Sequence, residues 1–171
     1  MAHFAICPAL EEQAGTIAAL RRQVWRETYR NIYPPQMLDG FDLAEHTRRD
    51  AARIRDPRYE VFLLTEDGTA VGYLILGPRP RLVCSLYLVR AAQGRGYGRR
   101  VFDFLRVRWA GEASFTCTCH PDNRRALGFY RKMGGQILDQ DLTNEESWQN
   151  SVTLVFPVEL PEAEAAILNN P

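Results

Sequence analysis

The sequence predicts a mixed α/β domain of six or seven strands, and three features support this. Segments rich in β-forming residues alternate with segments of helical periodicity, in the order strand, two helices, three strands, helix, strand, helix, two strands. Asp67-Gly68 between two β-rich runs predicts an antiparallel hairpin. The length of 171 residues, of which 46% are apolar, fits one globular domain. We expect this domain over residues 1–160 and a loose tail over residues 161–171.

The first part of the chain contains a short strand and two helices. Residues 2–7 form an apolar strand candidate, and residues 10–29 repeat apolar side chains at helical spacing. Pro34-Pro35 must interrupt that helix because proline lacks the N–H that a helix interior requires. A second helical stretch follows over residues 43–54.

Three strands follow, over residues 59–65, 70–76 and 82–89. The third run is apolar at most positions, so we expect a central strand buried on both faces.

The second half alternates helices and strands before a final antiparallel pair. Gly134-Gly135 is expected to stop the second of its helices. The predicted elements are helix 99–109, strand 113–119, helix 123–133, and strands 136–139 and 152–158.

Charge and cysteine content exclude several classes of protein. Equal numbers of basic and acidic side chains, 21 of each, exclude the broad basic field of a general nucleic-acid binder, and no apolar run is long enough to span a membrane. Cys7, Cys84, Cys117 and Cys119 lie in apolar runs, as buried thiols of a reducing compartment do. Cys117 to His120 has no second metal-binding knuckle. We therefore expect a cytoplasmic protein without a metal and without nucleic-acid or membrane partners.

The most informative motif is a glycine-rich turn, Gln93 to Arg100, between a buried strand and an amphipathic helix. Three alternating glycines let the backbone turn tightly and bring its N–H groups close to a ligand. The following helix points its positive dipole end at the turn, and arginines add positive charge. The motif predicts an anion site, best suited to a pyrophosphate.

Three other interpretations of the turn compete. A nucleotide P-loop needs a Lys-Ser/Thr pair, which is missing. A dinucleotide-binding fold needs Gly-x-Gly-x-x-Gly within repeated βαβ units, whereas the spacing here is Gly-x-Gly-x-Gly after an apparent meander. Taken alone, the motif also fits a tight surface turn that binds nothing.

A second motif, His120 to Gly135, follows the next strand. Taken together, the two motifs resemble the GNAT superfamily, the acetyl-CoA-dependent N-acetyltransferases. Strand, glycine turn, helix, strand and helix match this family in order and spacing over residues 82–135. The resemblance rests on Leu86 to Val89 with Gln93 to Arg99, and on Asn123, Ala126, Phe129-Tyr130 and Lys132 to Gly134.

The resemblance implies a fold and a set of site residues. The fold would be a single GNAT-like domain with a mostly antiparallel sheet of six or seven strands, a central splayed parallel pair and about four flanking helices. Tyr130 would protonate the departing thiolate, although it also fits a core aromatic position. Main-chain groups of the strand would bind the pantetheine arm, and the turn would hold the pyrophosphate. The implied cofactor-binding residues are Leu86, Tyr87, Leu88, Gln93, Gly94, Arg95, Gly96, Tyr97, Gly98, Arg99, Asn123 and Ala126.

The sequence departs from the family pattern at the general base. Many members place a carboxylate on the strand before or after the glycine turn, but neither strand has one here. His120 or Asp122 could serve instead, and a water relay is a further alternative. Asp122 is equally suited to cap the next helix.

The acceptor is expected to bind near the first helix, where Trp25, Tyr29 and Tyr33 would line an aromatic pocket; these rings also fit core positions. The predicted function is direct acetyl transfer from acetyl-CoA to a small-molecule amine or a peptide N-terminus. A covalent acetyl-cysteine route is conceivable, and a non-catalytic acyl-CoA-binding sensor is the alternative function. Dimers are common in this family, so a homodimer is the candidate assembly.

Overall fold

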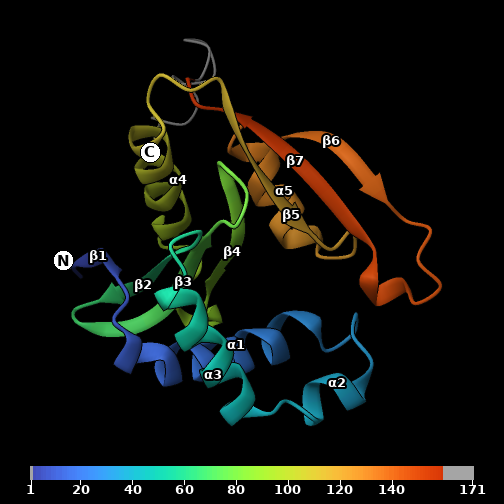
Figure 1. Ribbon diagram of the computed structural model, residues 1–171. Helices are drawn as coiled ribbons and strands as arrows, with labels where there is room; N and C mark the ends of the chain where they lie inside the picture. The colour runs from blue at the N-terminus through green and yellow to red at the C-terminus, as the bar shows by residue number, and fades with distance from the viewer. Residues whose placement is uncertain (1, 160–171) are drawn as a thin grey trace. The chain divides into compact units, whose positions relative to one another are not determined.

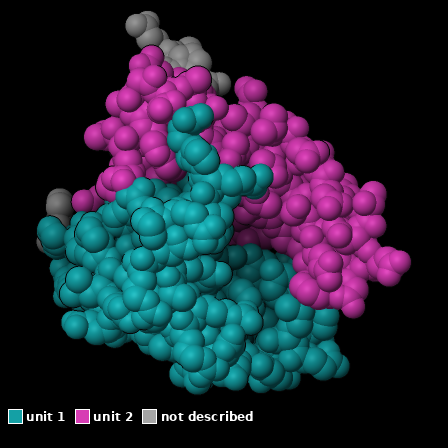
Figure 2. Space-filling model, viewed as in Figure 1, with its two compact units in different colours: residues 1–98 teal, residues 99–171 magenta. Residues whose placement is uncertain are grey.

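The computed structural model describes residues 2–159, and the chain divides into two compact units (Figures 1 and 2). Unit 1 comprises residues 1–98 and unit 2 residues 99–171. The chain passes from one to the other within the first turn of helix α4 (Tyr97–Arg108). The predicted tail, residues 161–171, lies outside the described residues, and the single-domain boundary at residue 160 stays a prediction.

Four strands of unit 1 pair in sequence order, each antiparallel to the next. The predicted hairpin is confirmed, because Glu66 pairs with Thr69 and both turn residues, Asp67 and Gly68, have positive φ. The strands are β1 (Phe4–Pro8), β2 (Glu60–Glu66), β3 (Thr69–Leu76) and β4 (Leu82–Leu88).

Strand β4 differs from the expectation of burial on both faces. Val83 is its one buried residue, and Cys84 is exposed. The register with β3 shifts by one residue at this point, since Ile75 pairs with Ser85 but Leu76 pairs with Val83. Cys84 is the extra residue of a β-bulge, which turns side chains out of the alternating pattern. A run of apolar residues in the sequence therefore does not prove that both faces of a strand are buried.

The helices of unit 1 are α1 (Ala14–Tyr29), α2 (Pro35–Asp39) and α3 (Leu43–Arg55). Helix α1 buries Ile17, Leu20 and Val24, and it packs on α3 and β3. The short helix α2 was not expected, because Pro34-Pro35 reads as a break. Helix α1 already ends at Tyr29, before the prolines, and Pro35 is the first residue of α2, where proline needs no N–H partner.

Unit 2 is built around a three-stranded antiparallel sheet in which β7 lies between β5 and β6 (Figure 1). Its core is an aromatic cluster: Phe115 stacks on Phe156 with centroids 5.1 Å apart, and Phe102 of α4 contacts both rings. All three side chains are buried. The remaining elements are β5 (Ser114–Cys119), α5 (Arg124–Lys132), β6 (Gln136–Asp141) and β7 (Ser151–Pro157).

Candidate functional site

The glycine turn of unit 1 has the conformation that its sequence predicts. Gly94 and Gly96 have φ of 79° and 81°, which only glycine adopts readily, and Gly98 lies in the first turn of α4. A Cβ at Gly94 or Gly96 would meet no atom within 4 Å, so the surface of the turn is open. The first N–H groups of a helix have no carbonyl partner within it, and they carry a partial positive charge. The turn is therefore accessible to an anion.

Two side chains of the turn, those of Arg95 and Tyr97, fold back onto unit 1. Arg95 forms an ion pair with Glu66, and the Tyr97 hydroxyl donates to the same carboxylate oxygen at 2.8 Å. The Tyr97 ring also stacks on Phe4, with centroids 4.3 Å apart. Glu66 thus offsets the charge of Arg95, so the main chain of the turn is the stronger candidate for holding a phosphate.

The main chain of β4 leads directly into this turn. Leu86, Tyr87 and Leu88 pair with Leu74, Tyr73 and Gly72 of β3. The side chain of Gln93 folds back and donates to the Leu88 carbonyl at 2.8 Å. A carbonyl oxygen has two lone pairs, so this bond leaves Leu88 able to accept another.

The three aromatic residues predicted for the acceptor pocket do come together in unit 1. Tyr29 stacks on Tyr33 with centroids 4.2 Å apart, and Trp25 meets the edge of Tyr33 at 5.9 Å. The hydroxyls of Tyr29 and Tyr87 are 2.6 Å apart, which connects this aromatic wall to β4. Burial raises the pKa of Tyr33 and of Tyr87, so these phenols stay neutral at pH 7.

Two more rings extend the aromatic wall, and the sequence reasoning missed both. Phe41 stacks on His46 with centroids 3.9 Å apart, and both meet the edge of Trp25. Burial and the nearby charges of Arg21 and Arg49 lower the pKa of His46. Phe41 lies between two helices, where no periodicity marks it.

A buried ion pair between helices α1 and α3 of unit 1 was also missed by the sequence reasoning. Arg21 of α1 donates to Asp50 of α3 at 2.8 Å, and Arg53 donates to the same carboxylate oxygen at 3.0 Å. The Arg21 guanidinium lies 4.8 Å from the centroid of the Tyr73 ring. Burial disfavours the charged guanidinium, but charge interactions with Tyr73 and Asp50 leave the pKa of Arg21 raised. A helical pattern marks such positions as polar and gives no sign that they are buried.

In unit 2, Tyr130 lies on the buried face of α5. Its ring is 5.8 Å from that of Phe156 and 6.1 Å from that of Phe102, and 7% of the residue is exposed. Burial raises the pKa of the neighbouring Cys117 thiol, against a hydrogen bond from Tyr130 that lowers it. Tyr130 therefore belongs to the aromatic core, while its hydroxyl reaches a polar neighbour.

His120 is buried, and both of its ring nitrogens have partners in unit 2. Nδ1 accepts from the backbone N–H of Asp122 at 3.0 Å, and Nε2 is 2.9 Å from the Ser147 carbonyl. Because Nδ1 accepts, Nε2 carries the proton and donates. A general base needs a free lone pair, so this arrangement favours a structural role for His120.

The start of α5 is capped by Asn123, whose Oδ1 accepts from the Ala126 N–H at 3.1 Å. The helix is therefore capped by Asn123 and not by Asp122, the preceding residue, which the sequence also suggested as a cap. The amide nitrogen of Asn123 is not used by the cap.

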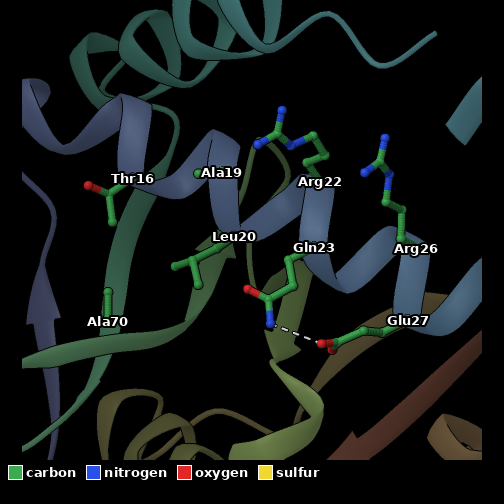
Figure 3. A pocket seen from close by; sticks show the side chains of 8 residues that line it. All are labelled: Thr16, Ala19, Leu20, Arg22, Gln23, Arg26, Glu27 and Ala70. Atoms are coloured by element: carbon green, nitrogen blue, oxygen red, sulfur yellow. Dashed lines mark hydrogen bonds between the residues drawn. The ribbon is translucent and has the colours of Figure 1, made fainter. Parts of the chain in front are cut away.

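A separate open pocket of about 500 Å³ lies along α1 (Figure 3). None of the predicted site residues lines it. Its lining residues are Thr16, Ala19, Leu20, Arg22, Gln23, Arg26, Glu27 and Ala70.

Two features are absent from the described residues, 2–159. They contain no group of three or more His, Cys, Asp or Glu side chains arranged to hold a metal ion. No helix among them is long and apolar enough to cross a membrane.

Comparison with solved structures shows the fold. The PaiA N-acetyltransferase of Thermoplasma acidophilum, in complex with coenzyme A, matches with a TM-score of 0.72 and 16% identity over 91% of this chain and 99% of that one. The yncA protein of Salmonella typhimurium, with its cofactor acetyl-CoA, matches with a TM-score of 0.66 and 19% identity over 94% of this chain and 99% of that one. A variant of the spermidine N-acetyltransferase SpeG of Vibrio cholerae matches with a TM-score of 0.67 and 12% identity over 91% of this chain and 94% of that one. The predicted fold class, an α/β fold with six or seven mostly antiparallel strands, is confirmed, and the described residues form seven strands.

No curated protein sequence matches the chain. The model of the acetyltransferase (GNAT) family, however, matches residues 21–135, which is more than half of the chain and includes both motifs. The family resemblance noted from the sequence is therefore confirmed, and the chain belongs to the acetyltransferase (GNAT) family.

Proposed function

We propose that this protein transfers the acetyl group of acetyl-CoA to a primary amine by direct transfer in a ternary complex. The observation that carries the proposal is the glycine turn, which is open to an anion and follows β4 within the region matched by the family model. Solved relatives of the same fold contain CoA or acetyl-CoA, which supports the donor.

The residues of the chain fit this donor. Main-chain groups of Leu86 to Leu88 would bind the pantetheine arm, and N–H groups from Gly94 to Arg99 would hold the pyrophosphate. Asn123 retains an amide nitrogen for a further hydrogen bond to the donor, and Ala126 beside it is small. Acetyl-CoA, when bound, supplies an activated acyl group and a thiol leaving group.

Tyr130 is assigned as the proton donor to the departing sulfur. A neutral phenol can donate at pH 7, and the position matches the family motif. The amine must lose a proton when the new C–N bond forms and the C–S bond breaks. Because both nitrogens of His120 are engaged, we assign this proton to water rather than to His120.

The acceptor class is a small-molecule amine or a peptide N-terminus. In the aromatic wall, the partly exposed rings of Trp25 and Tyr33 would attract the cation or the stem of an amine, while the buried Tyr29 supports Tyr33 by stacking on it. The related SpeG is a spermidine N-acetyltransferase, which gives a first compound to test. A cytoplasmic homodimer is our proposal for location and assembly.

A second candidate function is a sensor that binds acyl-CoA without turnover. Neither β4 nor β5 contains an aspartate or glutamate that could take the amine proton, and this observation favours it. Binding of acetyl-CoA without acetylation of any amine would support this alternative.

The test is release of free CoA thiol with a panel of amines, namely a polyamine, an amino acid, an aminoglycoside and a short peptide. Tyr130→Phe is expected to lower kcat about a hundredfold while acetyl-CoA affinity stays within a factor of three. Tyr59→Phe, a tyrosine to which no role is assigned, is the matched control. Full activity of Tyr130→Phe at every pH would refute the assignment of Tyr130.

A further inference from the structure

Glu27, on the last turns of α1, forms an unusual reciprocal contact with the segment that leads into the glycine turn. Its Oε2 accepts from the backbone N–H of Arg90 at 2.8 Å. The guanidinium of Arg90 in turn donates to the backbone carbonyl of Glu27 at 2.9 Å. The other carboxylate oxygen, Oε1, accepts from Gln23 at 2.9 Å (Figure 3).

Each bond satisfies a backbone group that its own helix leaves without a partner. The carbonyl of Glu27 is one of the last four of α1, which have no N–H partner within the helix. Arg90 is the first residue of a short 3₁₀ helix, Arg90–Ala92, so its N–H also lacks a helical acceptor. The C-terminal end of α1 and the start of the 3₁₀ helix therefore satisfy each other's backbone groups. A charged side chain takes part in both hydrogen bonds.

The contact joins two functional segments of unit 1. Glu27 lies two residues from both Trp25 and Tyr29 of the aromatic wall. Arg90 is connected to Gln93 by a backbone hydrogen bond of 3.2 Å, and Gly94 is the next residue. A shift of α1 would thus be transmitted to the start of the glycine turn through a short, hydrogen-bonded segment.

The orientation of neighbouring side chains separates Glu27 from an ordinary surface charge. Arg22 and Arg26 point away from the side of α1 on which Gln23 and Glu27 lie (Figure 3). The Glu27 carboxylate thus points away from Arg22 and Arg26 of its own helix. It faces the segment that precedes the glycine turn.

We propose that Glu27 is a positioning residue that couples the acceptor side of the site to the donor side. It holds the segment 88–96 in place relative to α1, so binding of the amine and binding of the CoA moiety favour each other. This inference rests on the proposed function. Coupling of this kind is reciprocal, because each ligand must change the affinity of the other by the same factor.

The experiment measures CoA affinity by calorimetry, with and without a saturating amine that the enzyme acetylates. CoA replaces acetyl-CoA so that no turnover occurs. We expect the amine to tighten CoA binding to the wild type and to the control Glu12→Ala, which removes an exposed carboxylate from the other end of this helical region. In Glu27→Ala, the Kd for CoA should rise about tenfold, and the effect of the amine should disappear.

Two further variants keep the inference testable if Glu27→Ala folds poorly. Glu27→Gln retains an amide oxygen for the Arg90 N–H and should recover most of the affinity. Arg90→Ala loses the guanidinium contact but keeps the N–H, and it should show an intermediate effect. In Glu27→Ala, hydrogen exchange over residues 88–96 should be faster than in the wild type, whereas Glu27→Gln should stay close to it.

Unchanged CoA affinity and unchanged amine coupling in Glu27→Ala would overturn the positioning role and leave the proposed function intact. Failure of the wild type to bind CoA would overturn both. The two failures are therefore distinguishable.

Discussion

The two units differ in what their interiors are made of. Unit 1 buries an ion pair, Arg21–Asp50, which contacts Tyr73, and a pair of phenols, Tyr29 and Tyr87, lies nearby on the same side of the sheet. Unit 2 is centred on packed rings, and the imidazole of His120 is buried there as well.

This difference indicates that the interiors of the two units contribute to stability in different ways. Among the described residues, four side-chain polar atoms are buried without a hydrogen-bond partner. Asp50 Oδ2, Arg21 Nε and the Tyr73 hydroxyl lie in unit 1, and Arg106 Nε lies in unit 2. Buried ion pairs contribute little net stability compared with apolar packing, so the interior of unit 1 is a costly arrangement.

The largest effect should come from the aromatic core of unit 2. Phe156→Ala removes a fully buried ring that contacts Phe102, Phe115 and Tyr130, and it should lower the free energy of unfolding by about 4 kcal/mol. Denaturant titration measures this loss. Val107→Ala on the exposed side of α4 is the control, and it should lower the free energy of unfolding by less than about 0.5 kcal/mol.

The next effect tests the polar interior of unit 1. Asp50→Asn leaves Arg21 buried without its counter-charge and should cost about 3 kcal/mol. Replacing both partners, as in Arg21→Met with Asp50→Leu, should restore stability to within about 1 kcal/mol of wild type. If the double variant is as unstable as Asp50→Asn, the ion pair itself contributes to stability and the contrast between the units is wrong.

Thiol reactivity should separate the units as well. Cys7 and Cys84 of unit 1 are exposed, contrary to the expectation of four buried thiols. In unit 2, burial raises the pKa of Cys119 to about 11 and raises that of Cys117 further. The thiolate is the reactive form, so the two thiols of unit 2 should react about a hundredfold more slowly with a disulfide reagent at pH 8. Fast reaction of all four thiols would contradict this and reopen the acetyl-cysteine route.

The smallest effect concerns His46 and pH. Burial and the charges of Arg21, Arg49 and Arg53 lower its pKa in the folded state, while Asp50 opposes them. Below the unfolded pKa of about 6.5, the unfolded chain therefore binds more protons, and stability falls as pH decreases. The loss should stay below about 1 kcal/mol because the ring is partly exposed. The difference in unfolding free energy between wild type and His46→Gln, followed from pH 7.5 to pH 5, measures it; a difference that does not vary with pH would contradict it.

The order of strands and helices could be predicted because it depends on local patterns. The Asp67-Gly68 hairpin, the glycine turn and the end of α5 just before Gly134 follow from backbone preferences of single residues. Helix α2 was missed because proline, which breaks a helix interior, can also begin a helix.

The composition of the candidate site was harder to predict. Trp25, Tyr29 and Tyr33 share one helix and the segment after it, so their proximity follows from sequence. The pairs Arg21–Asp50 and Glu27–Arg90 join residues 29 and 63 positions apart, and no periodicity signals such contacts. The state of His120 also depends on the distant carbonyl of Ser147.

The most direct test of the account is a thermal-shift titration of the wild-type protein with acetyl-CoA, with ATP as the comparison ligand. At about a hundred times its Kd, a ligand of the folded state adds about 2.7 kcal/mol, which should raise Tm by several degrees. The account predicts this shift with acetyl-CoA and little or none with ATP. No shift with acetyl-CoA at millimolar concentration would contradict it, and the glycine turn would then be a surface turn without a ligand.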